Sequence, residues 1–123
     1  MSYNVGLNLR IKIDNTSSET ERHVVKYIVD CCYQYEGCNV NSFFCFDIDC
    51  QYTEIHLSCV MPKQDATEML IHIHPYIRGG SITETDIIPE DTYAVLYSPN
   101  GEIEAVLNKT GLFFGKDLKQ VLK

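Results

Sequence analysis

The chain has 123 residues, a length that suits one domain with its own hydrophobic core. Hydrophobic residues make up 45% of it and charged residues 22%, which is typical of a globular protein and excludes an intrinsically disordered chain. The net charge is -7 and the sequence contains no run of Lys or Arg, so nucleic acid is excluded as a favourable partner.

No stretch approaches the roughly 18 apolar residues that a membrane-spanning helix needs, and the first residues lack the apolar run of a signal peptide. We therefore expect a cytoplasmic protein that does not bind membranes. The six cysteines include no C-x-x-C pair, the tight spacing that is usual in structural zinc sites; they are Cys31, Cys32, Cys38, Cys45, Cys50 and Cys59. In a reducing compartment we interpret them as buried free thiols.

The first half of the chain predicts a strand, a helix and two further strands. Apolar and polar residues alternate over residues 4–13, which indicates a half-buried strand. Residues 17–37 carry apolar side chains on one helical face and end at Gly37, a pattern typical of an amphipathic helix. Residues 42–50 and 52–61 are rich in aromatic and β-branched residues, and they predict two strands close enough for a hairpin.

The second half predicts more strands. Residues 70–77, LIHIHPYI, alternate and indicate a strand that the following glycines end. Residues 92–108 hold Pro-Asn-Gly between two apolar runs, a strong hairpin signal, and residues 115–123 predict a short closing helix. This order predicts an α+β fold: a single domain over residues 1–123, with a mostly antiparallel or mixed β-sheet and one long N-terminal helix.

Two histidines in the predicted strand suggest half of a metal site. His72 and His74 lie two residues apart, so in a strand both imidazoles point to the same face and can bind one ion. Asp86 follows a loop of small polar residues and can supply a third zinc ligand. Three protein ligands leave one position for water, which zinc activates as a nucleophile. An outward strand face that carries two histidines by chance is the alternative.

The segment HIHPYIRGGSITETD, residues 72–86, resembles the JAMM motif of the JAB/MPN metalloproteases: H-x-H-P, a loop, then S-x-x-D. The resemblance implies a minimal JAB/MPN-like fold in which His72, His74 and Asp86 bind Zn2+. It also implies a hydroxyl that stabilises the oxyanion. Thr83 holds the register with Asp86, whereas Ser81 lies nearer the usual distance from His74.

The resemblance further implies a general base, and Glu36 before Gly37 matches its place in the family; Glu54 and Glu68 are the alternatives. The protein would then be a zinc-dependent hydrolase of the JAB/MPN type. It would cleave an amide or isopeptide bond in a peptide or a ubiquitin-like conjugate, with the extended substrate added along a sheet edge. Asp86 lies one position further from His74 than in the family. This difference favours the alternative function: a non-catalytic acidic binding module, of the immunity or inhibitor type, that binds a protein partner.

Overall fold

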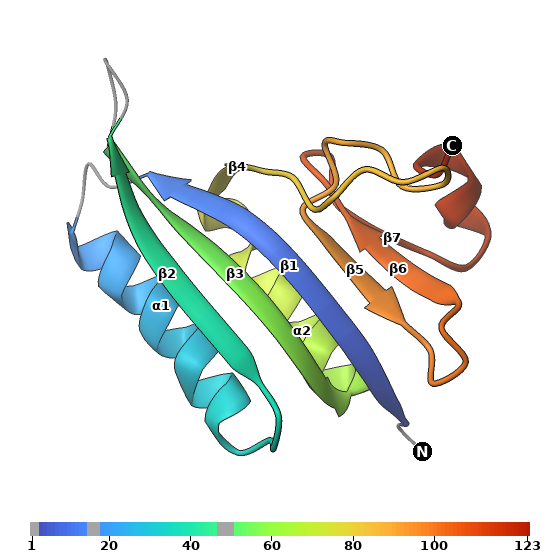
Figure 1. The fold of residues 1–123 in the computed structure, drawn as a ribbon, viewed down its shortest axis with the longest axis horizontal. Helices are drawn as coiled ribbons and strands as arrows, with labels where there is room; N and C mark the ends of the chain where they lie inside the picture. The colour runs from blue at the N-terminus through green and yellow to red at the C-terminus, as the bar shows by residue number, and fades with distance from the viewer. Residues whose placement is uncertain (1–2, 15–17, 47–50) are drawn as a thin grey trace.

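The computed structural model describes residues 3–14, 18–46 and 51–123 (Figure 1). Its elements in chain order are β1 (Asn4–Asp14), α1 (Ser18–Tyr33), β2 (Asn39–Phe46), β3 (Gln51–Pro62), α2 (Lys63–Ile73), the 3-10 helix η1 (His74–Tyr76), β4 (Ile77–Gly80), β5 (Ala94–Tyr97), β6 (Ile103–Leu107), β7 (Leu112–Phe114) and the 3-10 helix η2 (Gly115–Gln120). Among the described residues, no helix is both long and apolar enough to cross a membrane.

The strands form one antiparallel sheet in the order β2-β3-β1-β5-β6-β7, and β4 also pairs with β1. β1 pairs with β3 along its whole length on one edge. Its other edge is shared by β5 at residues 6–9 and by β4 at residues 11–13. From β1 to β4 the chain therefore follows the split β-α-β order, and β5 to β7 extend the sheet as a meander.

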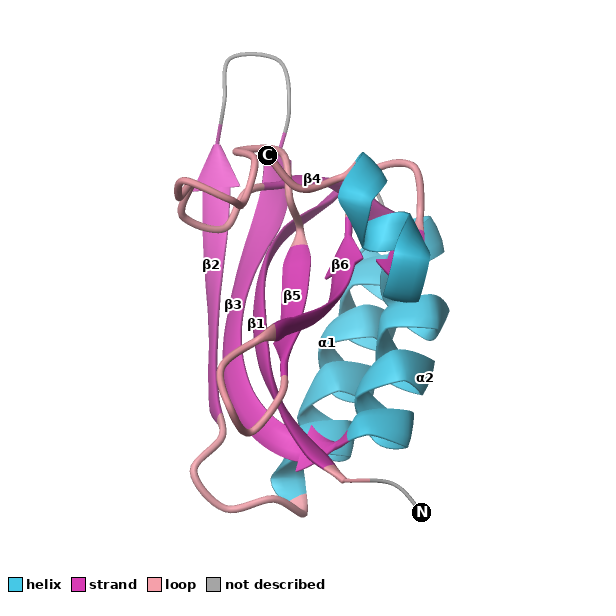
Figure 2. Ribbon diagram, turned by 90° about the vertical axis from the view of Figure 1, so that its right-hand side faces the viewer, coloured by secondary structure: helices cyan, strands magenta, loops and turns pink. Residues whose placement is uncertain are grey.

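Both α-helices cover the same face of β2, β3 and β1 (Figures 1 and 2). Alternate residues of β1 and β3 face these helices, because successive side chains of a strand point to opposite sides. The largest core cluster joins Val5, Leu7, Leu9, Ile11 and Ile13 of β1 and Ile55, Leu57, Cys59 and Met61 of β3 with Val24, Ile28 and Cys32 of α1 and Ala66, Met69, Leu70 and Ile73 of α2. The opposite face of β1 and β3 carries mainly polar residues.

The predicted α+β class with a mostly antiparallel sheet is confirmed, and so are two hairpins. β2 and β3 pair over eight positions, although the residues between them, 47–50, lie outside the described residues. β5 and β6 are joined by a turn in which Gly101 has a φ of 84° and donates its N–H to the carbonyl of Ser98 at 2.9 Å. The expectation of one long N-terminal helix is wrong, because the described residues hold two α-helices, α1 of 16 residues and α2 of 11.

The strand predicted over residues 70–77 is also wrong. The segment up to Ile73 is the end of α2, and His74 to Tyr76 form η1. The buried residues of α2 have the helical spacing i, i+3, i+4, i+7; they are Ala66, Met69, Leu70 and Ile73. Ile71, which the strand pattern placed beside Ile73, is 60% exposed. The helical period therefore outweighs a short alternation.

The two glycines that were expected to end this strand instead form part of one. Gly79 and Gly80 belong to β4 and pair with β1. A Cβ atom on Gly80 would collide with the backbone carbonyl of Arg10, so only glycine permits this close approach. β4 is thereby held against the same edge of β1 that β5 uses.

Candidate functional site

The structure does not bring His72 and His74 together. Side chains at positions i and i+2 of a helix point about 200° apart around its axis, since one turn takes 3.6 residues. His72 is exposed on α2, stacks on the ring of Tyr27 with 3.9 Å between centroids, and has its Nε2 atom 3.3 Å from Nε2 of His23. His74 points elsewhere and donates from Nε2 to the carbonyl oxygen of Asn108 at 3.1 Å. A zinc ion shared by the two histidines stays a prediction that this geometry does not support.

The other residues of the predicted hydrolase site lie on two different segments of the chain. Asp86 and Thr83 are exposed in the long segment between β4 and β5. Ser81 donates its hydroxyl to the carbonyl of Glu90, a contact within that same segment. Glu36 is exposed in the turn between α1 and β2. His72, His74 and Asp86 do not form a group of metal-ligating atoms within the described chain.

Three cysteines from separate elements do meet, on the helix-covered face of the sheet. Cys32 lies in the last turns of α1, on the buried helical face, and is 3% exposed. Cys59 lies in β3 and is equally buried, and Cys38 stands opposite it, one position before the β2–β3 register begins. Their sulfur atoms all lie within 4.8 Å of one another. Among the described residues, no other set of three His, Cys, Asp or Glu side chains that could hold a metal is found.

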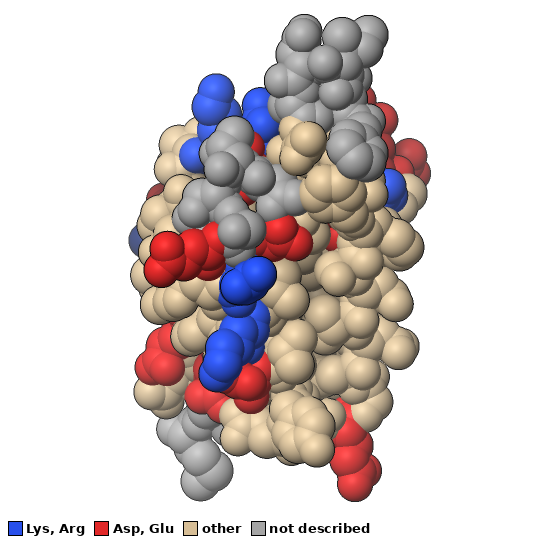
Figure 3. Space-filling model, turned by 90° about the vertical axis from the view of Figure 1, so that its left-hand side faces the viewer, with Lys and Arg blue, Asp and Glu red and all other residues tan. Residues whose placement is uncertain are grey.

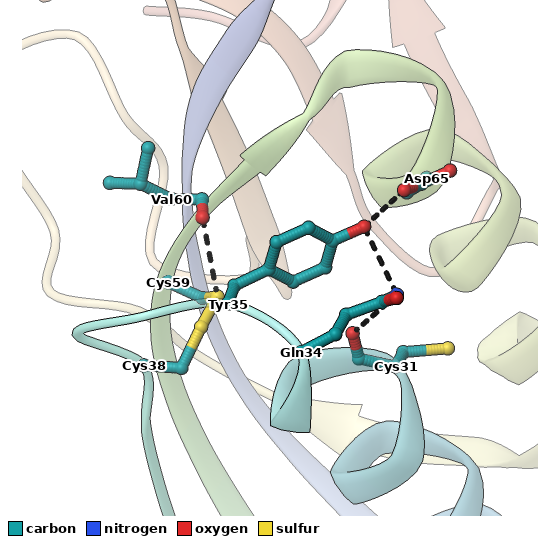
Figure 4. The surroundings of a disulfide bond; sticks show 7 residues. All are labelled: Cys31, Gln34, Tyr35, Cys38, Cys59, Val60 and Asp65. Atoms are coloured by element: carbon teal, nitrogen blue, oxygen red, sulfur yellow. Dashed lines mark hydrogen bonds between the residues drawn. A yellow bond between two sulfur atoms is a disulfide. The ribbon is translucent and has the colours of Figure 1, made fainter.

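Cys38 and Cys59 form a disulfide (Figure 4). Antiparallel pairing places the two residues directly opposite, with their Cα atoms 4.3 Å apart. The interpretation of all six cysteines as buried free thiols is therefore wrong for this pair. Cys31, Cys32 and Cys45 are free, whereas Cys50 lies outside the described residues.

The third thiol of the cluster stays protonated at neutral pH. Burial raises the pKa of the Cys32 thiol to about 11, and the neighbouring Cys31 adds to the rise. Because the thiolate is both the nucleophile and the metal ligand, Cys32 is a weak nucleophile towards the adjacent disulfide. A metal ion would change its state, since a coordinated thiol loses its proton to the solvent.

Tyr35 closes one side of the cysteine cluster. Its ring extends from the turn after α1 towards α2, where its hydroxyl donates to the carboxylate of Asp65 (Figure 4). This hydrogen bond, together with burial, raises the pKa of Tyr35 to about 12. Gln34 donates from Nε2 to the same hydroxyl at 3.1 Å. The phenol is therefore fixed between the two helices and beside the disulfide.

A cavity leads from the surface to two of the three cysteines. This cavity of about 410 Å³ opens between α1 and β2 and reaches Cys32 and Cys38. Val25, Val29 and Val40 give it mostly apolar walls. Cys32 and Cys38 line this cavity, so a small ion or a reductant has a route from the solvent to these two residues.

A cluster of charged side chains, separate from the cysteines, lies on the opposite face of the sheet. The carboxylate of Glu54 accepts hydrogen bonds from Arg10 at 2.6 Å and from His56 at 3.0 Å. Burial alone would raise the pKa of Glu54, but the hydrogen bonds and positive charges of its two partners outweigh it and lower the pKa. Arg10 and His56 also line a groove of about 380 Å³ that reaches Thr83. Each group of this ion cluster is satisfied by another, which is typical of a structural network on a polar sheet face.

Sequence reasoning missed the cysteine cluster because its members share no short motif. One signal was nonetheless present, because Cys32 continues the apolar helical face of α1. Cys38 and Cys59 gave no such signal, because they lie at unequal distances from residue 51, the centre of the hairpin predicted from residues 42–50 and 52–61.

No protein-family model, no curated protein and no solved structure matches this chain. The JAB/MPN-like fold is not confirmed, and the resemblance of residues 72–86 stays a resemblance of sequence.

Proposed function

We propose that this protein is a redox-gated metal-binding module, in which Cys32, Cys38 and Cys59 together hold a thiophilic ion once the Cys38–Cys59 disulfide is reduced. The observation that carries the proposal is the convergence of the three sulfur atoms within 4.8 Å of one another, from a helix, a turn and a strand. Thiolates select zinc or copper(I) over harder ions such as magnesium and calcium. Zinc, the ion expected from the sequence, remains the first candidate, now with different ligands.

The redox state of the Cys38–Cys59 disulfide would control metal binding. A dithiol reductant transfers two electrons and two protons to the Cys38–Cys59 bond and becomes a disulfide itself. The ion then displaces the protons of the three thiols, which pass to the solvent. Because the disulfide occupies two of the three ligands, the oxidised protein lacks the site. A cytoplasmic location, as expected from the sequence, would keep the pair reduced and the site ready.

Like the non-catalytic binding module considered from the sequence, the proposed protein binds without catalysing a reaction, but its ligand is a metal ion. Three thiolates leave one coordination position for a fourth ligand, as in zinc sites with three protein ligands. The cavity between α1 and β2 leads to Cys32 and Cys38, so the fourth ligand can come from the solvent or from a partner molecule. No substrate chemistry is needed for a protein that reports metal and redox state.

The test is to count zinc ions per chain by native mass spectrometry, before and after reduction with a phosphine, which binds zinc far more weakly than a dithiol reductant does. We expect about one zinc in the reduced protein and none in the oxidised protein. Cys32→Ser should lose the ion, whereas the matched control Cys45→Ser, a free cysteine outside the cluster, should keep it. Equal zinc content in Cys32→Ser and the wild type would overturn the proposal.

Zinc-dependent hydrolysis at His72, His74 and Asp86 is a separate hypothesis that the same measurement tests. Its support is the sequence resemblance. It requires zinc to be retained in Cys32→Ser and lost in His74→Ala, which is the opposite of the pattern expected for the cysteine site.

A further inference from the structure

β2 is the edge strand of the sheet. The strand order ends at β2, whose one partner among the described strands is β3. An edge strand presents backbone N–H and C=O groups that can pair with another chain. Natural proteins usually blunt such an edge with charged residues, proline or a bulge. The composition and register of β2 therefore decide whether it is protected.

β2 has none of these protective features. Its eight residues, NVNSFFCF, include no charged residue and no proline, and its register with β3 runs without a bulge. Phe43 and Phe44 are 48% and 52% exposed. The side of the molecule on which β2 and α1 lie shows a broad uncharged area next to charged side chains (tan in Figure 3). An uncharged strand with two exposed aromatic rings is a surface for pairing.

The register shows which backbone groups face the open edge. Cys38 and Cys59 stand opposite with 4.3 Å between Cα atoms, a spacing typical of the non-hydrogen-bonded pairs of an antiparallel ladder. Such pairs alternate with hydrogen-bonded ones, so Val40 and Ser42 are also non-hydrogen-bonded towards β3. Their N–H and C=O groups therefore point away from β3, to the edge where a further strand would add.

A second copy of the chain fits this edge better than a charged partner. Each chain carries a net charge of -7, so two copies repel except where neither presents charge. β2 is such a place, and an antiparallel pair of identical strands is self-complementary about a two-fold axis. With Ser42 opposite Ser42 of the second copy, Phe44 comes opposite Val40. About six backbone hydrogen bonds would then join the two strands.

The same register places an aromatic ring over the cavity beside the cysteines. Val40, Ser42 and Phe44 lie on the helix side of β2, because their β3 partners Leu57, Ile55 and Thr53 are buried. Val40 and Ser42 line the cavity of about 410 Å³ between α1 and β2. Phe44 of one copy, held opposite Val40 of the other, would therefore project over that cavity.

We propose that two copies of this chain pair antiparallel through β2, so that their sheets join into one and Phe44 of each copy covers the cavity next to Cys32 and Cys38 of the other. The pairing uses the oxidised, metal-free protein and does not depend on the proposed metal binding.

The test is sedimentation velocity of oxidised, chelator-treated protein across a range of concentrations, with a non-reducing gel to exclude disulfide-linked species. We expect a dimer for the wild type. Phe44→Glu should raise its dissociation constant about tenfold or more, because it removes a buried ring and puts a carboxylate into the contact. Val60→Glu is the matched control: Val60 is 57% exposed on β3, away from the edge, and its change should leave the dimer intact.

A second variant covers the case in which Phe44→Glu does not fold. Ser42→Lys places a charge at the centre of the proposed contact, on an exposed residue, and should also give monomers. A monomeric wild type at the highest concentration would overturn the proposal. So would a dimer that both Phe44→Glu and Ser42→Lys leave unchanged. The two proposals fail independently. A monomeric wild type whose zinc is still lost in Cys32→Ser would overturn the pairing and leave the metal site, whereas an intact dimer with equal zinc in Cys32→Ser and the wild type would do the reverse.

Discussion

Reduction of the Cys38–Cys59 disulfide should destabilise the metal-free protein by about 3 kcal/mol. The bond closes a loop with a sequence separation of 21 residues. For a loop of this length, the loss of chain entropy in the unfolded state corresponds to about 3 kcal/mol at 25 °C. Most of the effect should therefore come from the unfolded state.

The assay is urea denaturation of the oxidised and phosphine-reduced protein in the presence of a chelator, with the free energy of unfolding extrapolated to water. Cys45→Ser is the control, because it should show the same difference between the two redox states as the wild type. Addition of zinc to the reduced protein should restore stability, by about 2.7 kcal/mol at a free concentration 100 times the dissociation constant. A redox difference below about 1 kcal/mol would refute the loop-closure reasoning.

Three further predictions follow from the fold. Ile73→Ala should cost about 2–5 kcal/mol of unfolding free energy in urea denaturation and Ile71→Ala less than about 0.5, because the first is fully buried and the second 60% exposed; equal costs would favour a strand over α2. The pKa of Glu54 is lowered below its ordinary 4.5 in the folded protein, so its stabilisation is present above that pH and is lost as the pH falls through the folded value. Glu54→Gln should therefore cost about 1 kcal/mol at pH 7 and progressively less as the pH falls below 4.5, and a cost that does not change with pH would contradict this. Asp65→Asn should bring the pKa of Tyr35 down from about 12 towards its ordinary 10.0 in an ultraviolet absorbance titration, and an unchanged titration would show that the hydrogen bond is not its main cause.

The sequence predicts well those elements that have one buried and one exposed face. β1 alternates without interruption along its whole length, and every apolar position in the alternation is buried. The hairpin of β5 and β6 is predictable because a turn of the type around Gly101 requires a positive φ, which glycine adopts without strain.

The prediction of secondary structure fails where the same residues fit both the strand period of two and the helical period of 3.6. Residues 71–74 alternate apolar and polar as a strand would, but Leu70 and Ile73 also complete a helical stripe that begins at Ala66. Tertiary packing decides between the two, because the stripe fits into the core beneath β1 and β3. The predicted zinc site required His72 and His74 on one face of a strand. Because the segment is helical, it does not have that geometry.

The cysteine cluster depends on contacts that no local pattern encodes. Cys32 reaches the disulfide only because α1 packs across the sheet, and Cys38 meets Cys59 only because β2 pairs with β3 in one register. A shift of that register by one residue would move the facing side chains to opposite faces of the sheet. Such a site becomes visible only once the strand pairing is known.

The most direct test of the metal-binding proposal is the absorption spectrum of the reduced protein with Co2+ in place of zinc. Thiolate ligands give an intense sulfur-to-cobalt charge-transfer band in the near ultraviolet, whereas histidine and carboxylate ligands do not. The proposal predicts this band after reduction, its absence in the oxidised protein and its loss in Cys32→Ser. Cobalt bound without a thiolate band, or a band of equal strength in the oxidised protein, would contradict the assignment of Cys32, Cys38 and Cys59 as ligands.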